Sequence, residues 1–352
     1  MLAVAVTAVF SSQVALADGG ALHQGKQGVS VQMGTSGGSA SDISKAFCCG
    51  GTLGALVKRD GLLHILSNNH VLARSGSATA GEDTIQPGLI DMSCRAANAN
   101  IVGDFAGNIV PLGTANVDAA LSVARAGGVD TSGAILDIGI PCSATQAPTV
   151  SLPVMKSGRT TGFTTGTILS INTSVSIQYQ KGCNSGKKFT VSFVNQIVTG
   201  AMSAGGDSGA LLLSNDGTAN PVGLLYAGSS STTIYNPIAD VVGAFTAGGH
   251  TFSFVGASCA ATAEPAAAEL AVLSPAPDAI GRAHETKVEH EFDLMKRPGV
   301  LGVGIGSAEN DPTEAAIVVF LESPRGNIPP SIPRELDGTR VRVIFTDPFV
   351  AQ

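Results

Sequence analysis

The sequence predicts an all-β fold for most of the chain, because short apolar runs alternate with turn signals and helical periodicity is nearly absent. One example is a hairpin with strands at 52–57 and 62–66, separated by Lys58-Arg59-Asp60-Gly61. A helix is first indicated at 239–245. The 44 glycines and the 5% aromatic content also suit short strands joined by turns. Together these patterns indicate an all-β sandwich or barrel.

The composition changes near residue 260, which marks a domain boundary. Residues 1–260 contain 12 Lys and Arg and 13 Asp and Glu, whereas residues 261–352 contain 8 and 14. An Ala- and Pro-rich stretch at 259–278 is typical of a linker. We therefore expect a first domain over 25–258 and a small α+β domain of unknown role over 279–352.

The expected C-terminal domain begins with a helix and continues with three strands. Asp278 is positioned to cap a helix that runs to about Arg297. One face of this helix is apolar and comprises Val288, Phe292 and Met295. The strands are expected at 300–305, 315–322 and 340–346.

Two patterns in this domain resemble ligand sites but have simpler interpretations. Gly302-Val303-Gly304-Ile305-Gly306 is followed by an Asn-Asp-Pro turn instead of a helix, so it is interpreted as a glycine-rich strand and not as a nucleotide loop. His284 and His290 lie six residues apart on the expected helix and point to different faces, whereas helical zinc ligands lie four apart. We expect neither a cofactor nor a metal ion.

Residues 1–24 have the features of a leader or a signal-peptide remnant. Residues 1–17 are apolar and end in Ala15-Leu16-Ala17, which resembles a small-residue cleavage site, although no basic segment precedes them. Ser11-Ser12-Gln13 interrupts this run, and a membrane span needs about 20 apolar residues. With six cysteines, an even number, the leader predicts a secreted or periplasmic protein with disulfide bonds. The net charge of −7 argues against a nucleic-acid partner, and the oligomeric state is not indicated.

The stretch Ala204-Gly205-Gly206-Asp207-Ser208-Gly209-Ala210 is suited to hold an exposed nucleophile, Ser208. Its glycines permit backbone conformations closed to other residues and let a substrate approach the main chain closely. A tight turn here can aim the N–H groups of Gly206 and Ser208 at one point, as in an oxyanion hole. Taken alone, the pattern is more often ordinary turn chemistry.

Two upstream segments supply the partners that a serine nucleophile needs. His70 follows the strand expected at 62–66, and Asp118 stands at the start of another apolar run. The chain order His70, Asp118, Ser208 is one of three orders found in such triads. In this arrangement Ser208 attacks a carbonyl carbon and His70 takes its proton. Asp118 holds the imidazole and stabilises its charged form.

The chain resembles the chymotrypsin-like (trypsin-fold) serine peptidases of the bacterial secreted type, over residues 27–254, with an extra C-terminal domain. Five segments carry the resemblance in the family's order: Cys49-Gly50-Gly51-Thr52-Leu53, Asn69-His70-Val71, Val117-Asp118-Ala119-Ala120-Leu121, Lys156-Ser157-Gly158-Arg159-Thr160-Thr161-Gly162 and Gly223-Leu224-Leu225-Tyr226-Ala227-Gly228. The resemblance implies two barrels, over 29–121 and 149–254. The expected fold is therefore an all-β, chymotrypsin-like double β-barrel followed by a small α+β C-terminal domain.

The same resemblance implies a serine endopeptidase that hydrolyses protein or peptide substrates through an acyl-enzyme, with His70, Asp118 and Ser208 as the triad and Gly206 and Ser208 as the oxyanion hole. It assigns the substrate pocket to Met202, Ser203, Tyr226, Ala227 and Gly228. None of these is charged, so we expect an uncharged, small-to-medium apolar residue on the acyl side of the cleaved bond. Two alternatives stay open: a serine esterase of narrow specificity, and a catalytically silent trypsin-fold binding scaffold.

The sequence departs from the family's pattern at three points, one of which is that no cysteine flanks Ser208. Val71 stands where the family often has a cysteine, so Cys49 lacks its usual partner. No Ile-Val-Gly-Gly-like start is visible that could form a new N-terminus and pair with Asp207, so trypsin-type zymogen activation is not expected. Among the many pairings that six cysteines allow, we expect Cys142 with Cys183, because both flank the opening of the second barrel.

Overall fold

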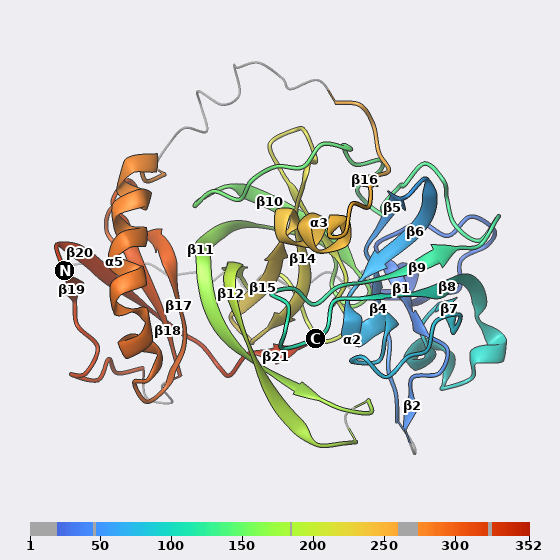
Figure 1. The fold of residues 1–352 in the computed structure, drawn as a ribbon, viewed down its shortest axis with the longest axis horizontal. Coiled ribbons are helices and arrows are strands. Elements are labelled where there is room, and N and C mark those ends of the chain that lie inside the picture. The colour runs from blue at the N-terminus through green and yellow to red at the C-terminus, as the bar shows by residue number, and fades with distance from the viewer. Residues whose placement is uncertain (1–19, 45–46, 184, 260–273, 323–325) are drawn as a thin grey trace, which may run out of the picture.

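The computed structural model of the chain describes residues 20–44, 47–183, 185–259, 274–322 and 326–352. These residues form two large β-sheets, of eight and eleven strands (Figure 1). The predicted leader over 1–24 lies outside the described residues except for α1 (Gly20–Gln24), and so does most of the predicted linker over 259–278. Within the described ranges, no helix is both long and apolar enough to span a membrane.

The first barrel is the eight-stranded sheet, with strand order β16-β5-β6-β9-β8-β7-β1-β4. Its strands are β1 (Thr35–Ser39), β4 (Gly51–Leu53), β5 (Ala55–Arg59), β6 (Leu62–Ser67), β7 (Asp83–Gln86), β8 (Asn100–Ile109), β9 (Ala120–Ala124) and β16 (Phe252–Phe254). The predicted hairpin is confirmed, since β5 pairs with β6 and the turn residues Asp60 and Gly61 have φ of 51° and 79°. A two-residue turn with both φ positive matches the twist of the flanking strands, which favours Asp-Gly there. Leu56, Ile65 and Leu121 are buried in the core of this barrel.

Shorter elements complete the first half of the chain. They are the small sheet of β2 (Ile43–Ser44) and β3 (Phe47–Cys48), the helix α2 (Asn69–Leu72), and the 3-10 helices η1 (Leu89–Met92) and η2 (Ala96–Asn98). Of these, α2 carries His70 at the end of β6, and the β2–β3 sheet borders the cleft described below.

The second barrel is formed by six strands of the eleven-stranded sheet. They are β10 (Pro153–Gly158), β11 (Gly162–Gln180), β12 (Lys188–Gly200), β13 (Leu211–Ser214), β14 (Pro221–Gly228) and β15 (Thr232–Pro237), and α3 (Ile238–Thr246) follows. The longest of these strands, β11, has 19 residues. Register shifts between Ile168 and Val175 bend β11 there, so the apolar pattern is interrupted while the strand continues.

The C-terminal part consists of the predicted helix and strands. They are α5 (Pro277–Met295), β17 (Val300–Ser307), β18 (Ala315–Leu321), β19 (Glu335–Leu336), β20 (Thr339–Phe345) and β21 (Val350–Ala351). The expected cap is wrong: Ala276 holds the N-cap position, and Asp278 lies in the first turn, where it pairs with Arg282. The expected apolar face points outward, since Val288 and Phe292 are 61% and 70% exposed.

The glycine-rich segment is a strand, as predicted, and its glycines allow a close approach to the second barrel. β17 pairs antiparallel with β11. A Cβ atom on Gly304 would lie 2.2 Å from Ser170 Oγ, and one on Gly306 would lie 2.4 Å from the Leu169 carbonyl oxygen. Larger residues at these positions would separate the two strands. The glycines therefore serve sheet packing.

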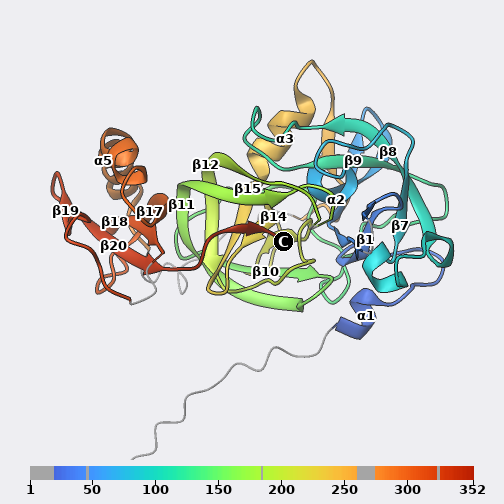
Figure 2. The ribbon, with the colours of Figure 1, turned by 90° about the horizontal axis from the view of Figure 1, so that it is seen from below.

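The C-terminal part shares its sheet and some of its core with the second barrel. Pairing of β17 with β11 joins β18, β20 and β19 to the barrel's sheet (Figure 2). One buried cluster contains Val175, Phe193 and Tyr226 of the barrel together with Phe320 and Phe349 of the C-terminal part. The all-β double barrel with a small C-terminal α+β part is confirmed as the fold. The composition change near residue 260 does not, however, separate two independent hydrophobic cores.

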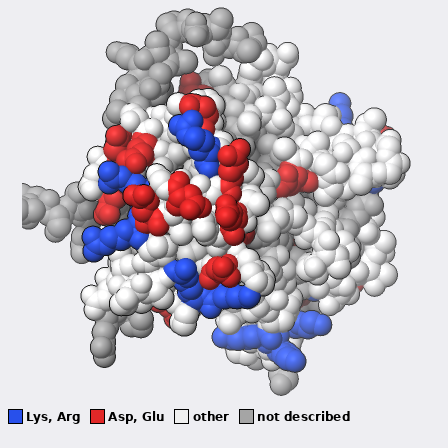
Figure 3. All heavy atoms as spheres, turned by 60° about the vertical axis from the view of Figure 1, so that its left-hand side comes forward, with Lys and Arg blue, Asp and Glu red and all other residues white. Residues whose placement is uncertain are grey.

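Charged side chains gather on the C-terminal part, in agreement with the composition. In Figure 3 the Lys, Arg, Asp and Glu side chains crowd the face that carries α5, beside a barrel surface that is mostly uncharged. Ion pairs on this part join Lys287 to Glu291 and Arg340 to Glu314. Lys287 is buried at its pair, whereas the Arg340–Glu314 pair is exposed, and exposed pairs contribute little to stability.

The predicted Cys142–Cys183 disulfide is wrong. The structure pairs Cys48 with Cys94, Cys49 with Cys183, and Cys142 with Cys259. The hairpin of β11 and β12 extends toward the first barrel, which brings Cys183 to Cys49. Cys142 instead meets the segment after β16, where it forms a β-bridge with Ala257. Only the tertiary path of the hairpin could reveal this exchange of partners.

Candidate active site

His70 and Asp118 form a tightly held pair between the two barrels. The His70 Nδ1 atom lies 2.6 Å from Asp118 Oδ2, and the His70 backbone N–H donates to Asp118 Oδ1 at 3.2 Å. Asp118 is fully buried, and its own N–H donates to the Asn236 side chain of the second barrel. The Asn68 side chain in turn donates to the Asp118 carbonyl oxygen at 2.7 Å. This network fixes both the position and the tautomer of the imidazole.

Tyr179 is a further member of this network, which the sequence analysis did not identify as a site residue. Its hydroxyl donates to Asp118 Oδ2 at 2.8 Å, and its ring lies edge-on to His70 with centroids 5.9 Å apart. Burial and the charge of Asp118 raise the pKa of the Tyr179 hydroxyl well above its usual value, so it stays a donor. The sequence signal was weak, since Tyr179 ends a strand whose reach to the first barrel depends on the tertiary fold.

Ser208 lies in the predicted tight turn, and its hydroxyl bonds to a group other than His70. Its hydroxyl donates to the Tyr226 carbonyl oxygen at 3.1 Å, and its side chain is fully buried. Gly206 and Gly209 have φ of 101° and 97°, which non-glycine residues rarely adopt. In the described part of the chain, Ser208 makes no hydrogen bond to His70, and the N–H groups of Gly206 and Ser208 make none at all.

The second ring nitrogen of His70 faces a carbonyl group from the distant end of the chain. Its Nε2 atom lies 3.1 Å from the Gln352 carbonyl oxygen. Because both ring nitrogens face oxygen acceptors, the arrangement requires the doubly protonated imidazolium. Burial lowers the pKa of His70, but the charge and hydrogen bond of Asp118 and the Gln352 carbonyl raise it more, so the pKa lies above its usual value. An imidazolium cannot accept a proton from Ser208, in agreement with the direction of that hydroxyl.

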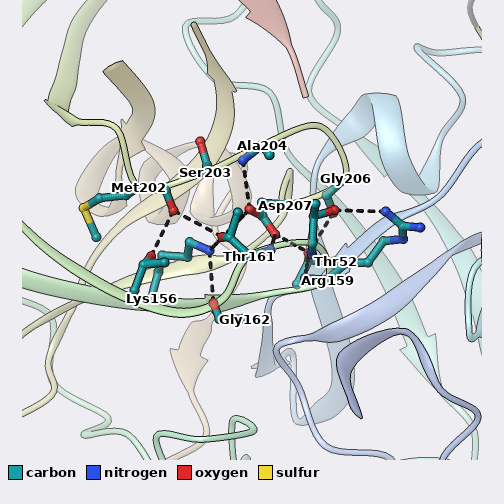
Figure 4. Close-up of polar contacts among 12 residues, drawn as sticks. Thr52, Lys156, Arg159, Thr161, Gly162, Met202, Ser203, Ala204, Gly206 and Asp207 are labelled. Atoms are coloured by element: carbon teal, nitrogen blue, oxygen red, sulfur yellow. Dashed lines mark hydrogen bonds and ion pairs between the residues drawn. The ribbon is translucent and has the colours of Figure 1, made fainter. Parts of the chain in front are cut away.

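Asp207 is held by a buried lysine and by several backbone donors (Figure 4). The Lys156 Nζ atom lies 3.3 Å from Asp207 Oδ2, and both side chains are fully buried. The backbone N–H groups of Thr160, Thr161 and Ala204 also donate to this carboxylate. Lys156 thus supplies the cation that a new N-terminus would otherwise have to bring to Asp207. Burial lowers the pKa of Lys156, and the charge of Asp207 opposes that shift.

The predicted pocket residues divide into two groups. The Met202 side chain is packed in the barrel core, and in Figure 4 it points to a different side of the loop from the Ser203 hydroxyl. The Tyr226 ring packs against Phe193 in another core cluster. By contrast, Ser203 Oγ donates to Gln352 Oε1 at 2.6 Å. Residues Ala227 and Gly228 of β14 pair with β21.

A cleft of about 560 Å³ opens beside His70 and continues past Gln352. It is bordered by the β2–β3 sheet, the Cys49–Cys183 disulfide, and Gly205 and Gly206 of the serine loop. Gly206, whose N–H has no hydrogen-bond partner among the described residues, is one of the residues that line this cleft. A scissile carbonyl between Ser208 and this cleft would find both an attacking group and donors for its oxygen.

One group of residues has an arrangement that could hold a metal ion. Among the described residues, Glu289, His290 and Asp337 bring their ligand atoms within 4.8 Å of one another on the surface of the C-terminal part. His290 Nε2 already binds Asp337 Oδ2, and the group includes exposed side chains. It lies outside the site formed by His70 and Asp118. His284, the other histidine considered in the sequence, does not belong to this group.

Comparison with solved structures gives a consistent group of similar proteins. A glutamic acid specific serine protease aligns at 18% identity and a TM-score of 0.44, covering 64% of this chain and 100% of its own. Thermobifida fusca Protease A aligns at 17% and 0.43, and Cellulomonas bogoriensis chymotrypsin at 20% and 0.41; each covers 65% of this chain and 100% of its own. These are bacterial chymotrypsin-like serine proteases.

Comparison by sequence identifies no further similar protein. No protein-family model matches the chain, and no curated protein sequence matches it. The C-terminal part lies outside the stretch that the solved proteases cover.

Proposed function

We propose that the protein is a serine endopeptidase that uses His70, Asp118 and Ser208 as a triad. The observation that carries this proposal is the 2.6 Å contact between His70 Nδ1 and the fully buried Asp118 carboxylate. A carboxylate in that position selects the tautomer in which Nε2 can act as a base. The nearby Ser208, between two glycines with positive φ, is the group that such a base would activate.

The proposed reaction begins when Ser208 Oγ turns from the Tyr226 carbonyl toward a neutral His70. The Oγ–H proton passes to His70 Nε2 as Oγ bonds to the substrate's carbonyl carbon, and the resulting oxyanion accepts hydrogen bonds from the N–H groups of Gly206 and Ser208. His70 then gives the proton to the leaving amine as the C–N bond breaks. A water molecule, deprotonated by the same imidazole, releases the acyl group and restores Ser208.

The proposal extends to the compartment and the substrate class. Three disulfides favour an oxidising environment, so we infer that the protein acts outside the cytoplasm, as a secreted or periplasmic enzyme. The open cleft beside His70 suits extended protein or peptide segments. No cofactor is needed for this acyl transfer.

Labelling with a fluorophosphonate tests the proposal directly. We expect modification of Ser208 in the folded protein, hydrolysis of casein and of a nitrophenyl ester, and the loss of all three in Ser208→Ala. Ester hydrolysis without casein cleavage would indicate the esterase alternative instead. Absence of labelling after overnight incubation, with no hydrolysis of either substrate, would refute the enzyme and favour the silent scaffold.

A further inference from the structure

The last residues of the chain run along the strand that borders the serine loop. Val350 and Ala351 form β21, which pairs antiparallel with Ala227 and Gly228 of β14 and, at Val350, in parallel with β11. The Gln352 N–H donates to the Tyr226 carbonyl oxygen at 3.2 Å. Figures 1 and 2 both show this end of the chain between the second barrel and α2. A strand added in this way is a general mode of peptide recognition.

The last residue of this strand meets the catalytic groups from two directions. Its carbonyl oxygen lies 3.1 Å from His70 Nε2, and its side-chain oxygen lies 2.6 Å from Ser203 Oγ. The backbone thus directs a carbonyl at the base while the side chain enters the predicted pocket. Gln352, Ala351 and His70 all line the same cleft. Gln352 therefore has the position of a substrate residue on the acyl side of a cleaved bond.

The hydrogen bonds in the pocket run in one direction, toward the glutamine side chain. The Met202 N–H donates to Thr233 Oγ1 at 3.0 Å, and Thr233 Oγ1 lies 2.8 Å from Ser203 Oγ. Because Ser203 donates its only proton to Gln352 Oε1, Thr233 must donate to Ser203. The pocket therefore offers a hydroxyl donor to an uncharged carbonyl oxygen. A purely apolar side chain would leave that donor without a partner, at a cost in affinity.

Close packing supports the same fit. A Cβ atom on Gly228 would lie 2.5 Å from Gln352 Nε2, so the glycine leaves room for the amide. Phe349, which precedes the strand, is 1% exposed and packs edge-on against Phe320. Val350 is 39% exposed. The strand is thus anchored at Phe349, while Ala351 is only partly buried against the same cluster.

We propose, on the basis of the proposed function, that residues 350–352 occupy the substrate cleft of their own chain and inhibit the enzyme in cis. The same contacts indicate that the preferred substrate is an extended peptide with glutamine before the cleaved bond. This replaces the apolar preference expected from sequence, because Ser203 and Thr233 add a donor that only the folded pocket reveals. Tethering gives the strand an effective concentration on the order of mM, so weak intrinsic binding is enough to compete with a substrate.

Two changes to the full chain test the occupancy. Removal of residues 350–352, and separately Gln352→Arg, should each raise the rate of fluorophosphonate labelling of Ser208 by at least about tenfold. Gln352→Arg keeps the chain length, so the test survives if the deletion fails to fold by circular dichroism. Val288→Ser is the control, because Val288 is 61% exposed on α5 and belongs neither to β21 nor to the cleft; it should label at the rate of the unchanged chain. Equal labelling rates in all four proteins would overturn the inhibition.

A binding experiment separates this inference from the proposed function. The probe is acetyl-Phe-Val-Ala-Gln-amide, titrated calorimetrically into Ser208→Ala protein with and without residues 350–352. We expect binding only to the shortened protein, and at least tenfold weaker binding of the same peptide ending in Arg or Leu. If no variant is labelled but the peptide binds as expected, the enzyme is refuted and the occupancy stands. If labelling is fast and the shortened protein binds no peptide, the occupancy is refuted and the enzyme stands.

Specificity has its own readout. On the shortened enzyme, kcat/KM for acetyl-Phe-Val-Ala-X-nitroanilides should be at least tenfold higher with X as Gln than with X as Leu or Arg. Ser203→Ala should reduce the preference for Gln over Leu, since it removes the donor. A higher kcat/KM for Leu than for Gln in the unsubstituted pocket would overturn the assignment of a glutamine pocket.

Discussion

Replacement of Lys156 by methionine should leave the fold recognisable but greatly weakened. The substitution keeps the buried apolar stem and removes the ammonium that lies 3.3 Å from Asp207. Removal of one partner of a buried ion pair typically costs about 3–5 kcal/mol, because an uncompensated charge stays in the interior. We expect about 3 kcal/mol, at the lower end, because the N–H groups of Thr160, Thr161 and Ala204 still donate to the carboxylate. That is a large fraction of a typical stability of about 5–15 kcal/mol.

Urea unfolding measures the loss in free energy of unfolding caused by Lys156→Met. Both proteins carry Ser208→Ala to prevent self-digestion. The double variant Lys156→Met/Asp207→Asn is the control, since it removes the negative charge of Asp207 together with the ammonium of Lys156. Its loss should be smaller than the sum of the two single losses, with a coupling of at least about 1 kcal/mol. With Ser208 restored, Lys156→Met should lower kcat at least tenfold through the adjacent serine loop. A stability loss below about 1 kcal/mol, or additive single losses, would refute the role of the ion pair.

Four further predictions follow from the site and the sheet. Ser208→Ala should remove peptidase turnover with an unchanged circular dichroism spectrum; retention of more than a tenth of the activity would exclude Ser208 as the nucleophile. Tyr179→Phe should lower kcat about tenfold with little change in KM, because the Asp118 carboxylate loses a hydrogen bond worth roughly 1.5–3 kcal/mol; an unchanged kcat would contradict this. Activity should rise with pH through the raised pKa of His70, since only the neutral imidazole is a base. Removal of residues 350–352 should shift this rise in activity to lower pH, because it removes the Gln352 carbonyl that raises the pKa. The facing groups Asp118, Asp42 and Tyr179 are unchanged in both proteins, so an identical pH profile would count against the contact between His70 and Gln352. Deletion of residues 277–352 should give an insoluble or non-cooperatively melting protein, because it exposes the shared cluster around Phe193 and Tyr226; a cooperative melt would show that the barrels fold alone.

The pH argument also has a consequence for stability. Because the folded-state pKa of His70 lies above its ordinary value, the contribution of His70 to stability is fully present below that ordinary value. It is lost as the pH rises through the raised pKa. Protonation therefore strengthens the contact with Gln352, and a rising pH weakens it. A rising pH therefore favours both the release of residues 350–352 and the activation of His70 as a base.

The local pattern was enough to predict much of the fold. The hairpin at Asp60-Gly61, the helix near residues 239–245 and the three C-terminal strands depend on turn chemistry and short-range periodicity, which a sequence displays directly. The glycine-rich strand was predicted because no helix follows it. Register shifts in β11 interrupt its apolar pattern, so the sequence does not display the continuity of this 19-residue strand.

Site residues divide in the same way. His70, Asp118 and Ser208 could be proposed from sequence because each stands next to an apolar run, in the chain order of a known triad. Tyr179 and Lys156 could not be assigned their roles, because each acts on a residue that is distant in sequence: Tyr179 on Asp118, and Lys156 on Asp207. The disulfide pairs were misjudged for the same reason.

The sequence by itself therefore determined the β class, the order of the candidate triad and the composition of the C-terminal part, since these follow from neighbouring residues. Only the tertiary structure decided which cysteines pair, which cation holds Asp207 and what occupies the cleft. The pairing of β17 with β11 carries the chain back to the barrel, so β21 can reach β14 and Gln352 can reach His70. Contacts across 282 residues of chain depend on how sheets close in space, and no local pattern encodes them.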